Sequence, residues 1–154
     1  MARKTFISLE DGSDRPGFWV IDRFLEVYLR FLLQHLENSP EADSPSHAIR
    51  EQWHLASTGY FGGFVPHGFE EAVGTPEGER LTLAAIHSLT AALKNAPEKL
   101  SKDVINLLWQ DQYIVWDEDV ETSGLVQISE ALVALIEGRI TTTAEEADLV
   151  PRPI

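Results

Sequence analysis

Residues 47–73, HAIREQWHLASTGYFGGFVPHGFEEAV, decide how the chain is organised, because a helical pattern breaks here into an aromatic and glycine-rich turn. Ile49, Trp53 and Ala56 recur at spacings of four and three, which predicts a helix with one apolar face. A second helical start follows the turn near Val73. The stretch therefore predicts two helices joined by a loop with unusual backbone geometry.

Three glycines punctuate this loop. Gly59 suits the left-handed position just after a helix, and the pair Gly62 and Gly63 permits a tight backbone turn. The loop carries too much apolar surface to leave in water, since burying one large aromatic side chain is worth roughly 1.5–3 kcal/mol. We expect burial above all of Phe61 and Phe64, within the apolar group Tyr60, Phe61, Phe64 and Val65.

Five segments have the apolar periodicity of helices: residues 18–36, 47–57, 76–94, 101–108 and 123–137. The first has two apolar stripes, so we expect it to be the central, most buried helix, in contact with the second and third. Thr75 and Pro76 form a helix-start signature. The segment from Ser101 should bury the side chains of Val104, Ile105, Leu107 and Leu108.

These patterns predict an all-α fold, a single-domain bundle of about five helices with an aromatic and glycine-rich loop. Residues 5–9 leave room for one short strand pair. The predicted domain spans residues 1–140, and the Thr-, acid- and Pro-rich residues 141–154 are expected to be a mobile C-terminal tail.

Composition limits the chemistry. The chain has 154 residues, 44% of them hydrophobic, and no cysteine, which excludes disulfides, thiolate zinc sites and a cysteine nucleophile. The N-terminal MARKTFISLEDGSD lacks the apolar run of a secretory signal, and no apolar run approaches the ~20 residues that span a bilayer. We expect a cytoplasmic protein without a cofactor, since no cofactor motif is present.

The charge is strongly acidic. Twelve Lys and Arg stand against 25 Asp and Glu, and the formal net charge is −13 at pH 7. Such a field repels nucleic acids and anionic membranes and attracts basic proteins, so we expect a basic protein partner, no nucleic acid and no membrane. A solubility charge without a partner is the alternative.

Acids and aromatics alternate between residues 109 and 121, WQDQYIVWDEDVE, and no Lys or Arg lies between Lys102 and Arg139. Trp and Tyr anchor many protein interfaces, and carboxylates there meet Arg or Lys. The predicted partner-binding residues, with Trp116 as an exposed anchor, are Trp109, Asp111, Tyr113, Trp116, Asp117, Glu118, Asp119 and Glu121. Alternatively, Trp109 and Trp116 are core residues beneath an acidic rim.

Histidines and acids near the glycine-rich loop raise the question of a metal or a catalytic site. His47 and His54 are seven residues apart, about two helical turns, which is too far to chelate one ion. His67 meets Glu70 across one turn only in a helix that already begins at His67, and Gly68 argues against that. We therefore expect no metal site and no catalytic residues.

The chain's general character resembles a known group of proteins. An acidic, cysteine-free, mostly helical chain of this size is similar to the immunity proteins of bacterial polymorphic and contact-dependent toxin systems. Residues 50–73, REQWHLASTGYFGGFVPHGFEEAV, also resemble stretches in uncharacterised bacterial proteins. The resemblance implies a non-catalytic protein that binds a basic toxin domain and blocks its site.

Two other functions remain open from the sequence. One is a homo-oligomeric structural domain. The other is a hydrolase in which a His and a Glu act together, which needs a cleft that brings His47, His54 or His67 near Glu70 or Glu71.

Overall fold

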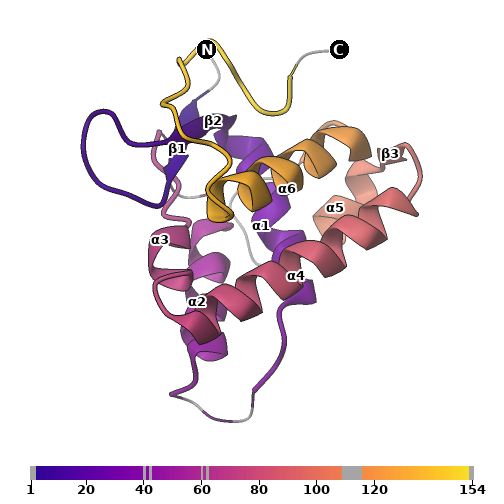
Figure 1. The fold of residues 1–154 in the computed structure, drawn as a ribbon. Coiled ribbons are helices and arrows are strands. Elements are labelled where there is room, and N and C mark those ends of the chain that lie inside the picture. The colour runs from indigo at the N-terminus through magenta and orange to yellow at the C-terminus, as the bar shows by residue number, and fades with distance from the viewer. Residues whose placement is uncertain are drawn as a thin grey trace.

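A β-hairpin opens the fold and leads directly into the central helix (Figure 1). The computed structural model describes residues 3–39, 41, 43–59, 61, 63–108 and 116–152. In the hairpin, β1 (Lys4–Ser8) pairs antiparallel with β2 (Gly17–Ile21). The pairs Thr5–Val20 and Ile7–Phe18 face inward and are buried, in keeping with the two-residue period of a strand.

The mostly helical fold is as predicted, and this hairpin is the strand pair that the sequence left room for at residues 5–9, but a second small hairpin means that the fold is not purely all-α. Residues 18–21, predicted as the first turn of a helix, form β2, and the helix α1 begins only at Asp22 (Asp22–His35). Phe18 and Val20 lie two apart, so they fit a strand as well as a helical stripe, and pairing with β1 decides between the two. A second antiparallel pair joins β3 (Lys99–Leu100) to β4 (Val120–Glu121).

The fold is mostly helical and forms one domain. Within the described residues there are six helices: α1, α2 (Pro45–Ala56), α3 (Phe69–Ala72), α4 (Pro76–Lys94), α5 (Lys102–Leu108) and α6 (Thr122–Ile136). Helices α4 and α6 pack side by side, with α1 against both (Figure 1). None of these helices, over the part of the chain that the structure describes, is long and apolar enough to cross a membrane.

Helix α1 is central, as its double apolar stripe predicts. Its side chains Leu25, Val27, Leu29 and Leu32 are completely buried, and the helix contacts α2 and α4. Tyr28 is also completely buried, and its hydroxyl lies 2.8 Å from the Ser129 hydroxyl on α6. Burial raises the pKa of Tyr28, so its hydroxyl stays protonated.

The helix starts agree well with the sequence signals. Thr75 is the N-cap of α4, its hydroxyl accepts the Gly78 N–H at 3.0 Å, and Pro76 is the first helical residue. Helix α2 starts slightly earlier than predicted, at Pro45, with Ser44 as its cap. Both boundaries therefore follow from local backbone chemistry.

The glycine-rich loop is held by one buried polar network. Thr5 donates its hydroxyl to one oxygen of the Asp22 carboxylate at 2.6 Å, and the Gly63 N–H donates to the other at 2.7 Å. The Thr5 hydroxyl in turn accepts the Val65 N–H at 2.9 Å. The network ties the loop to both β1 and the first turn of α1, where the helix dipole also favours a negative charge.

The loop is anchored, but not by the side chains we expected. Gly59 and Gly63 have positive φ angles of 83° and 84°, as predicted for the first and for one of the two paired glycines. Val65 is buried and Phe61 is half-buried, but Phe64 is 67% exposed, so the prediction that it is buried is wrong. Backbone hydrogen bonds to Asp22 and Thr5 hold the loop, so Phe64 need not be buried. Tyr60 and Gly62 lie outside the described residues.

Helix α5 buries less than its sequence predicts. Ile105 is completely buried and Leu108 is partly buried, but Val104 is 49% and Leu107 66% exposed. Only seven residues long, α5 follows β3 closely and presents one narrow face to the core. The prediction that Val104 and Leu107 are buried is therefore wrong.

The C-terminal segment lies along the open edge of β2. Gly17 donates its N–H to Thr142 and accepts the Ala144 N–H, both at 3.2 Å, while Val150 donates to the Trp19 carbonyl at 2.8 Å. These bonds satisfy edge groups that a two-stranded sheet leaves unpaired. The mobility predicted for residues 141–154 stays a prediction, because the hydrogen bonds do not measure motion.

We expect residues 25–32 of α1 to show the slowest amide hydrogen exchange, roughly a hundredfold slower than residues 142–152. Opening α1 exposes the whole core, whereas releasing the tail breaks a few edge hydrogen bonds. Exchange measured by NMR at neutral pH tests this. Equal protection of the two segments would make the tail part of the cooperative core and contradict its predicted mobility.

We expect Thr5→Val to lower the free energy of unfolding by about 2 kcal/mol. Valine keeps the shape of the side chain but removes the donor to Asp22 and the acceptor for Val65. Urea denaturation measures the change, with Thr141→Val, an exposed threonine, as the matched control. A loss no larger than that of the control would show that this network does not hold the loop.

Candidate functional site

The predicted partner surface is only partly within the described residues. Trp109, Asp111 and Tyr113 lie outside them. Trp116, Asp117, Glu118, Asp119 and Glu121 are described, and they lie between α5 and α6. The site below is therefore built on these five residues and their neighbours.

Trp116 is half-buried, whereas we predicted an exposed anchor. The Asn106 side chain forms two hydrogen bonds with the backbone of Trp116: it accepts the Trp116 N–H at 2.7 Å and donates to the Trp116 carbonyl at 2.8 Å. The guanidinium of Arg23 lies over its ring, 4.3 Å from the centroid. The ring also packs against the core, so Trp116 combines the two alternatives, a core residue and part of a surface.

The acids beside Trp116 differ in their surroundings. Asp117 forms an ion pair with Arg23 at 3.2 Å, and Asp119 accepts the Lys102 N–H at 2.9 Å at the start of α5. Glu118 and Glu121 are exposed and have no ion-pair partner in the described chain. Asp119 likewise has no ion-pair partner among the described residues, so Glu118, Asp119 and Glu121 all carry uncompensated negative charge.

An open groove of about 590 Å³ lies beside these acids. Ile21, Phe24, Trp116, Leu149 and Pro151 give it an apolar floor, while Glu118, Asp119 and Glu121 lie on its polar rim. Arg23 and Arg152 also line it, from α1 and the C-terminal segment. The sequence does not predict either arginine here, because nothing local places them beside residues 116–121.

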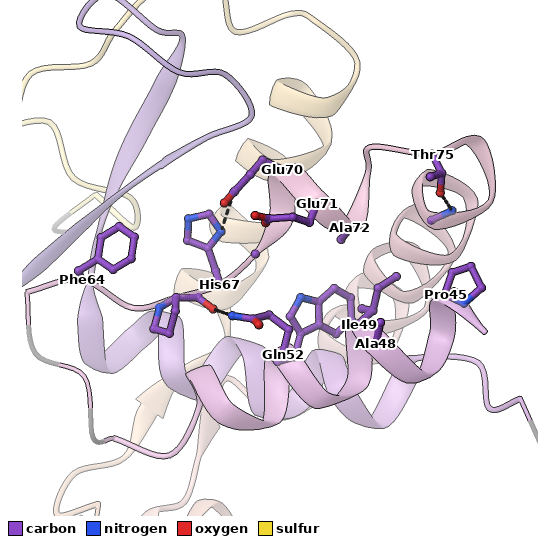
Figure 2. Close-up of a pocket in the computed structure, with 14 residues that line it drawn as sticks. Pro45, Ala48, Ile49, Gln52, Phe64, His67, Glu70, Glu71, Ala72 and Thr75 are labelled. Carbon is purple, nitrogen blue, oxygen red and sulfur yellow. Dashed lines mark hydrogen bonds and ion pairs between the residues drawn. The ribbon is translucent and has the colours of Figure 1, made fainter. Parts of the chain in front are cut away.

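A second hollow, of about 620 Å³, lies between α2, α3 and the end of the glycine-rich loop (Figure 2). Its apolar lining includes Pro45, Ile49, Trp53, Phe64, Pro66 and Ala72, and its polar lining includes Gln52, His67, Glu70 and Glu71. Gln52 on α2 donates its side-chain N–H to the Pro66 carbonyl and so closes one end (Figure 2). The sequence draws attention to His67, Glu70 and Glu71 but does not predict the hollow that they line.

His67 is a buried, neutral residue with its ring bonded to the backbone. It is 5% exposed, and its Nδ1 accepts the Phe69 N–H at 3.1 Å. Because Nδ1 is an acceptor, the proton belongs on Nε2. Burial lowers the pKa of His67 to about 4, and the charge of Glu71 offsets only part of this.

Glu70 and Glu71 form a pair of carboxylates above His67 (Figure 2). Glu70 lies 3.8 Å from His67 Nδ1, but the neutral imidazole presents a lone pair there, so the contact is not an ion pair near pH 7. Partial desolvation and a hydrogen bond to Glu70 raise the pKa of Glu71. Neither carboxylate pairs with Lys or Arg within the described ranges.

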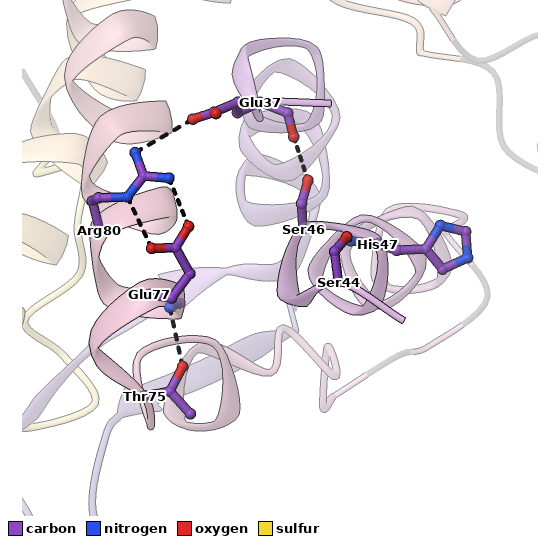
Figure 3. A network of polar contacts seen from close by, with 8 residues as sticks. Glu37, Ser44, Ser46, His47, Thr75, Glu77 and Arg80 are labelled. Atoms are coloured by element: carbon purple, nitrogen blue, oxygen red, sulfur yellow. Dashed lines mark hydrogen bonds and ion pairs between the residues drawn. The ribbon is translucent and has the colours of Figure 1, made fainter. Parts of the chain in front are cut away.

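A third polar cluster, shown in Figure 3, joins the end of α1 to the starts of α2 and α4. Arg80 binds Glu77 with two N–H groups, at 2.7 and 3.1 Å, and reaches Glu37 at 3.4 Å. Ser46 donates its hydroxyl to the Glu37 carbonyl. The charges of this cluster are exposed but already paired with one another. The cluster therefore links the ends of three helices and is not a candidate binding site.

Neither a metal site in the described residues nor a similarity to known proteins points to a function. In the described part of the chain, no three His, Asp or Glu side chains gather closely enough to hold an ion. Comparison of the chain with models of protein families, with curated proteins and with solved structures found no match. The chemistry of the two hollows is therefore the guide to function.

We expect the His67 ring to stay neutral between pH 7.5 and 5, with the proton on Nε2, and to titrate only near pH 4. Burial and the Phe69 N–H both oppose protonation, whereas a histidine in an unfolded chain titrates near pH 6.5. Two-dimensional NMR of the imidazole nitrogens measures both the tautomer and the midpoint. A midpoint near 6.5 would contradict the buried geometry.

The lowered pKa of His67 also makes the free energy of unfolding depend on pH. The unfolded chain takes up a proton on His67 as the pH falls through 6.5, and the folded chain only near 4, so stability falls by about 3 kcal/mol across this window. Burial raises the pKa of Glu26 to about 7, which has the opposite effect between pH 7 and 4.5. Glu26→Gln removes that opposing effect, so we expect a steeper acid loss in this variant than in the wild type.

Proposed function

We propose that this chain is a non-catalytic acidic binding protein that captures a basic protein, as an immunity protein captures a toxin domain. The supporting observation is that Glu118 and Glu121, exposed and without an ion-pair partner among the described residues, border a groove with an apolar floor. Acids at a rim steer a basic partner, and the apolar floor supplies area to bury.

The two arginines of the groove narrow the choice of partner. Arg23 is held by Asp117 and by the Trp116 ring, and Arg152 lies in the same lining. A uniformly basic surface would place positive charge against them, which costs free energy. The partner that fits places Lys or Arg against Glu118 and Glu121, and neutral or acidic groups against Arg23 and Arg152.

The other two functions considered from the sequence fit less well. His67 is buried with its ring bonded to the backbone, which does not suit a general base that must reach a substrate. A homo-oligomer would bring two chains of charge −13 together, and like charges oppose this association.

We expect Glu118→Gln/Glu121→Gln to capture fewer basic proteins than the wild type in a pull-down from source lysate at low salt. The substitution removes two of the three unpaired acidic charges that line the groove and leaves Asp117 and Asp119, which have structural contacts. With a captured partner, association should slow roughly threefold to tenfold, and added salt should slow the wild type similarly.

Glu79→Gln/Glu130→Gln is the matched control, because it removes the same charge from exposed positions on α4 and α6 outside the groove. It should capture the same proteins as the wild type. Equal losses in the two variants would assign capture to net charge alone. A captured set no more basic than the lysate would reject the basic partner.

The immunity form of the proposal has a further test. A reading frame directly upstream should encode a basic domain that arrests growth when expressed, and this chain should relieve the arrest. The groove variant should relieve it less than the control variant does.

A further inference from the structure

We propose that the hollow between α2 and α3 is a binding site for a small organic cation with an apolar body and an oxygen at its far end. This site shares no residue with the acidic groove, so the inference does not depend on the proposed function. It rests on the size, the lining and the charge of the hollow, on an unpaired donor beneath it, and on the rigidity of its walls.

The size and the lining fit a small molecule. About 620 Å³ lies within the usual range of ligand pockets, and the floor combines aromatic and aliphatic side chains with a few polar groups at one end. Ile49 and Trp53 are buried parts of this floor. Figure 2 shows Glu70 and Glu71 on one side of the opening and Ile49 and Ala48 on the other.

The charge of the hollow calls for a cation. Glu70 and Glu71 are adjacent carboxylates, and the side chain beneath them, His67, is neutral. The nearby arginines are engaged elsewhere, since Arg80 pairs with Glu77 and Arg15 lies over the Phe6 ring at 5.0 Å. A ligand ammonium would relieve the repulsion between the two carboxylates, a role that no Lys or Arg fills among the described residues.

Phe64 and Trp53 add two more features. Phe64 is 67% exposed and lines the same hollow, so its ring is free to cover an ammonium or an apolar body. The Trp53 side chain is completely buried in the floor, and its indole N–H has no acceptor within the described part of the chain. A buried donor without a partner is costly, so a small shift of the side chains that cover it, which lets a ligand oxygen reach it, would be favoured.

The hollow is also preorganised. Gly68 has a φ of 67°, and a Cβ there would lie 2.6 Å from Gln52 Cγ, so the loop packs tightly on α2 at this point. Gln52 and His67 then fix the loop through their bonds to Pro66 and Phe69. A ligand would meet walls that need little ordering, which favours affinity.

The probe is tyramine, a phenolic ammonium, with two matched compounds. Tyrosol replaces its ammonium by a hydroxyl, and phenethylamine lacks its phenol oxygen. Titrations followed by amide chemical shifts at neutral pH give both the affinity and the place of binding. We expect shifts at Gln52, Gly68 and Ala72, tyramine binding at least about fivefold tighter than tyrosol, and about threefold tighter than phenethylamine.

Variants assign the effect to residues. Glu70→Gln/Glu71→Gln should remove the preference for tyramine over tyrosol, and Phe64→Ala should weaken tyramine about threefold. All three side chains are exposed, so the fold should tolerate these changes. Glu118→Gln/Glu121→Gln, in the other groove, is the matched charge control and should leave tyramine affinity unchanged.

Four results would overturn the proposal. Equal affinity for tyramine and tyrosol would leave an apolar hollow without selectivity for a cation. Equal affinity for tyramine and phenethylamine would remove the role of the Trp53 donor. Tyramine-induced shifts confined to other parts of the chain would show that tyramine binds elsewhere. An equal loss of tyramine affinity in Glu70→Gln/Glu71→Gln and in the control variant would show the same.

Discussion

The buried carboxylate of Asp22 is the constraint on which most of the structure depends. It receives the Thr5 hydroxyl from β1 and the Gly63 N–H from the glycine-rich loop, and it stands in the first turn of the central helix. Three segments distant in sequence therefore meet at one charged group. Without these bonds, a buried carboxylate would be strongly unfavourable, so the hairpin, the loop and α1 stabilise one another.

This anchor also explains why the loop presents its aromatic side chain outward. With the backbone of residues 63–65 bonded to Asp22 and Thr5, Val65 is buried and Phe64 remains in solvent. The loop then continues to His67, whose ring accepts the Phe69 N–H. One wall of the hollow between α2 and α3 is thus set by hydrogen bonds of the loop backbone, rather than by apolar packing alone.

The two hollows suggest different chemistry. The groove beside residues 116–121 combines acids, two arginines and an apolar floor on an open surface, as a protein interface does. The hollow beneath Glu70 and Glu71 is lined by a smaller set of aromatic and aliphatic side chains and has carboxylates at one end.

The sequence by itself determined the helices and their boundaries where local chemistry decides them: the Thr75 cap, the left-handed Gly59 and the double stripe that makes α1 central. Only the tertiary structure decided that residues 18–21 are a strand, since the partner β1 is separated from them by the loop of residues 9–16. It likewise brought Arg23 and Arg152 into the lining of the groove beside Trp116, and it buried His67 so that its ring is neutral. Periodicity and caps act within a few residues, whereas pairing, burial and charge compensation depend on which distant segments meet.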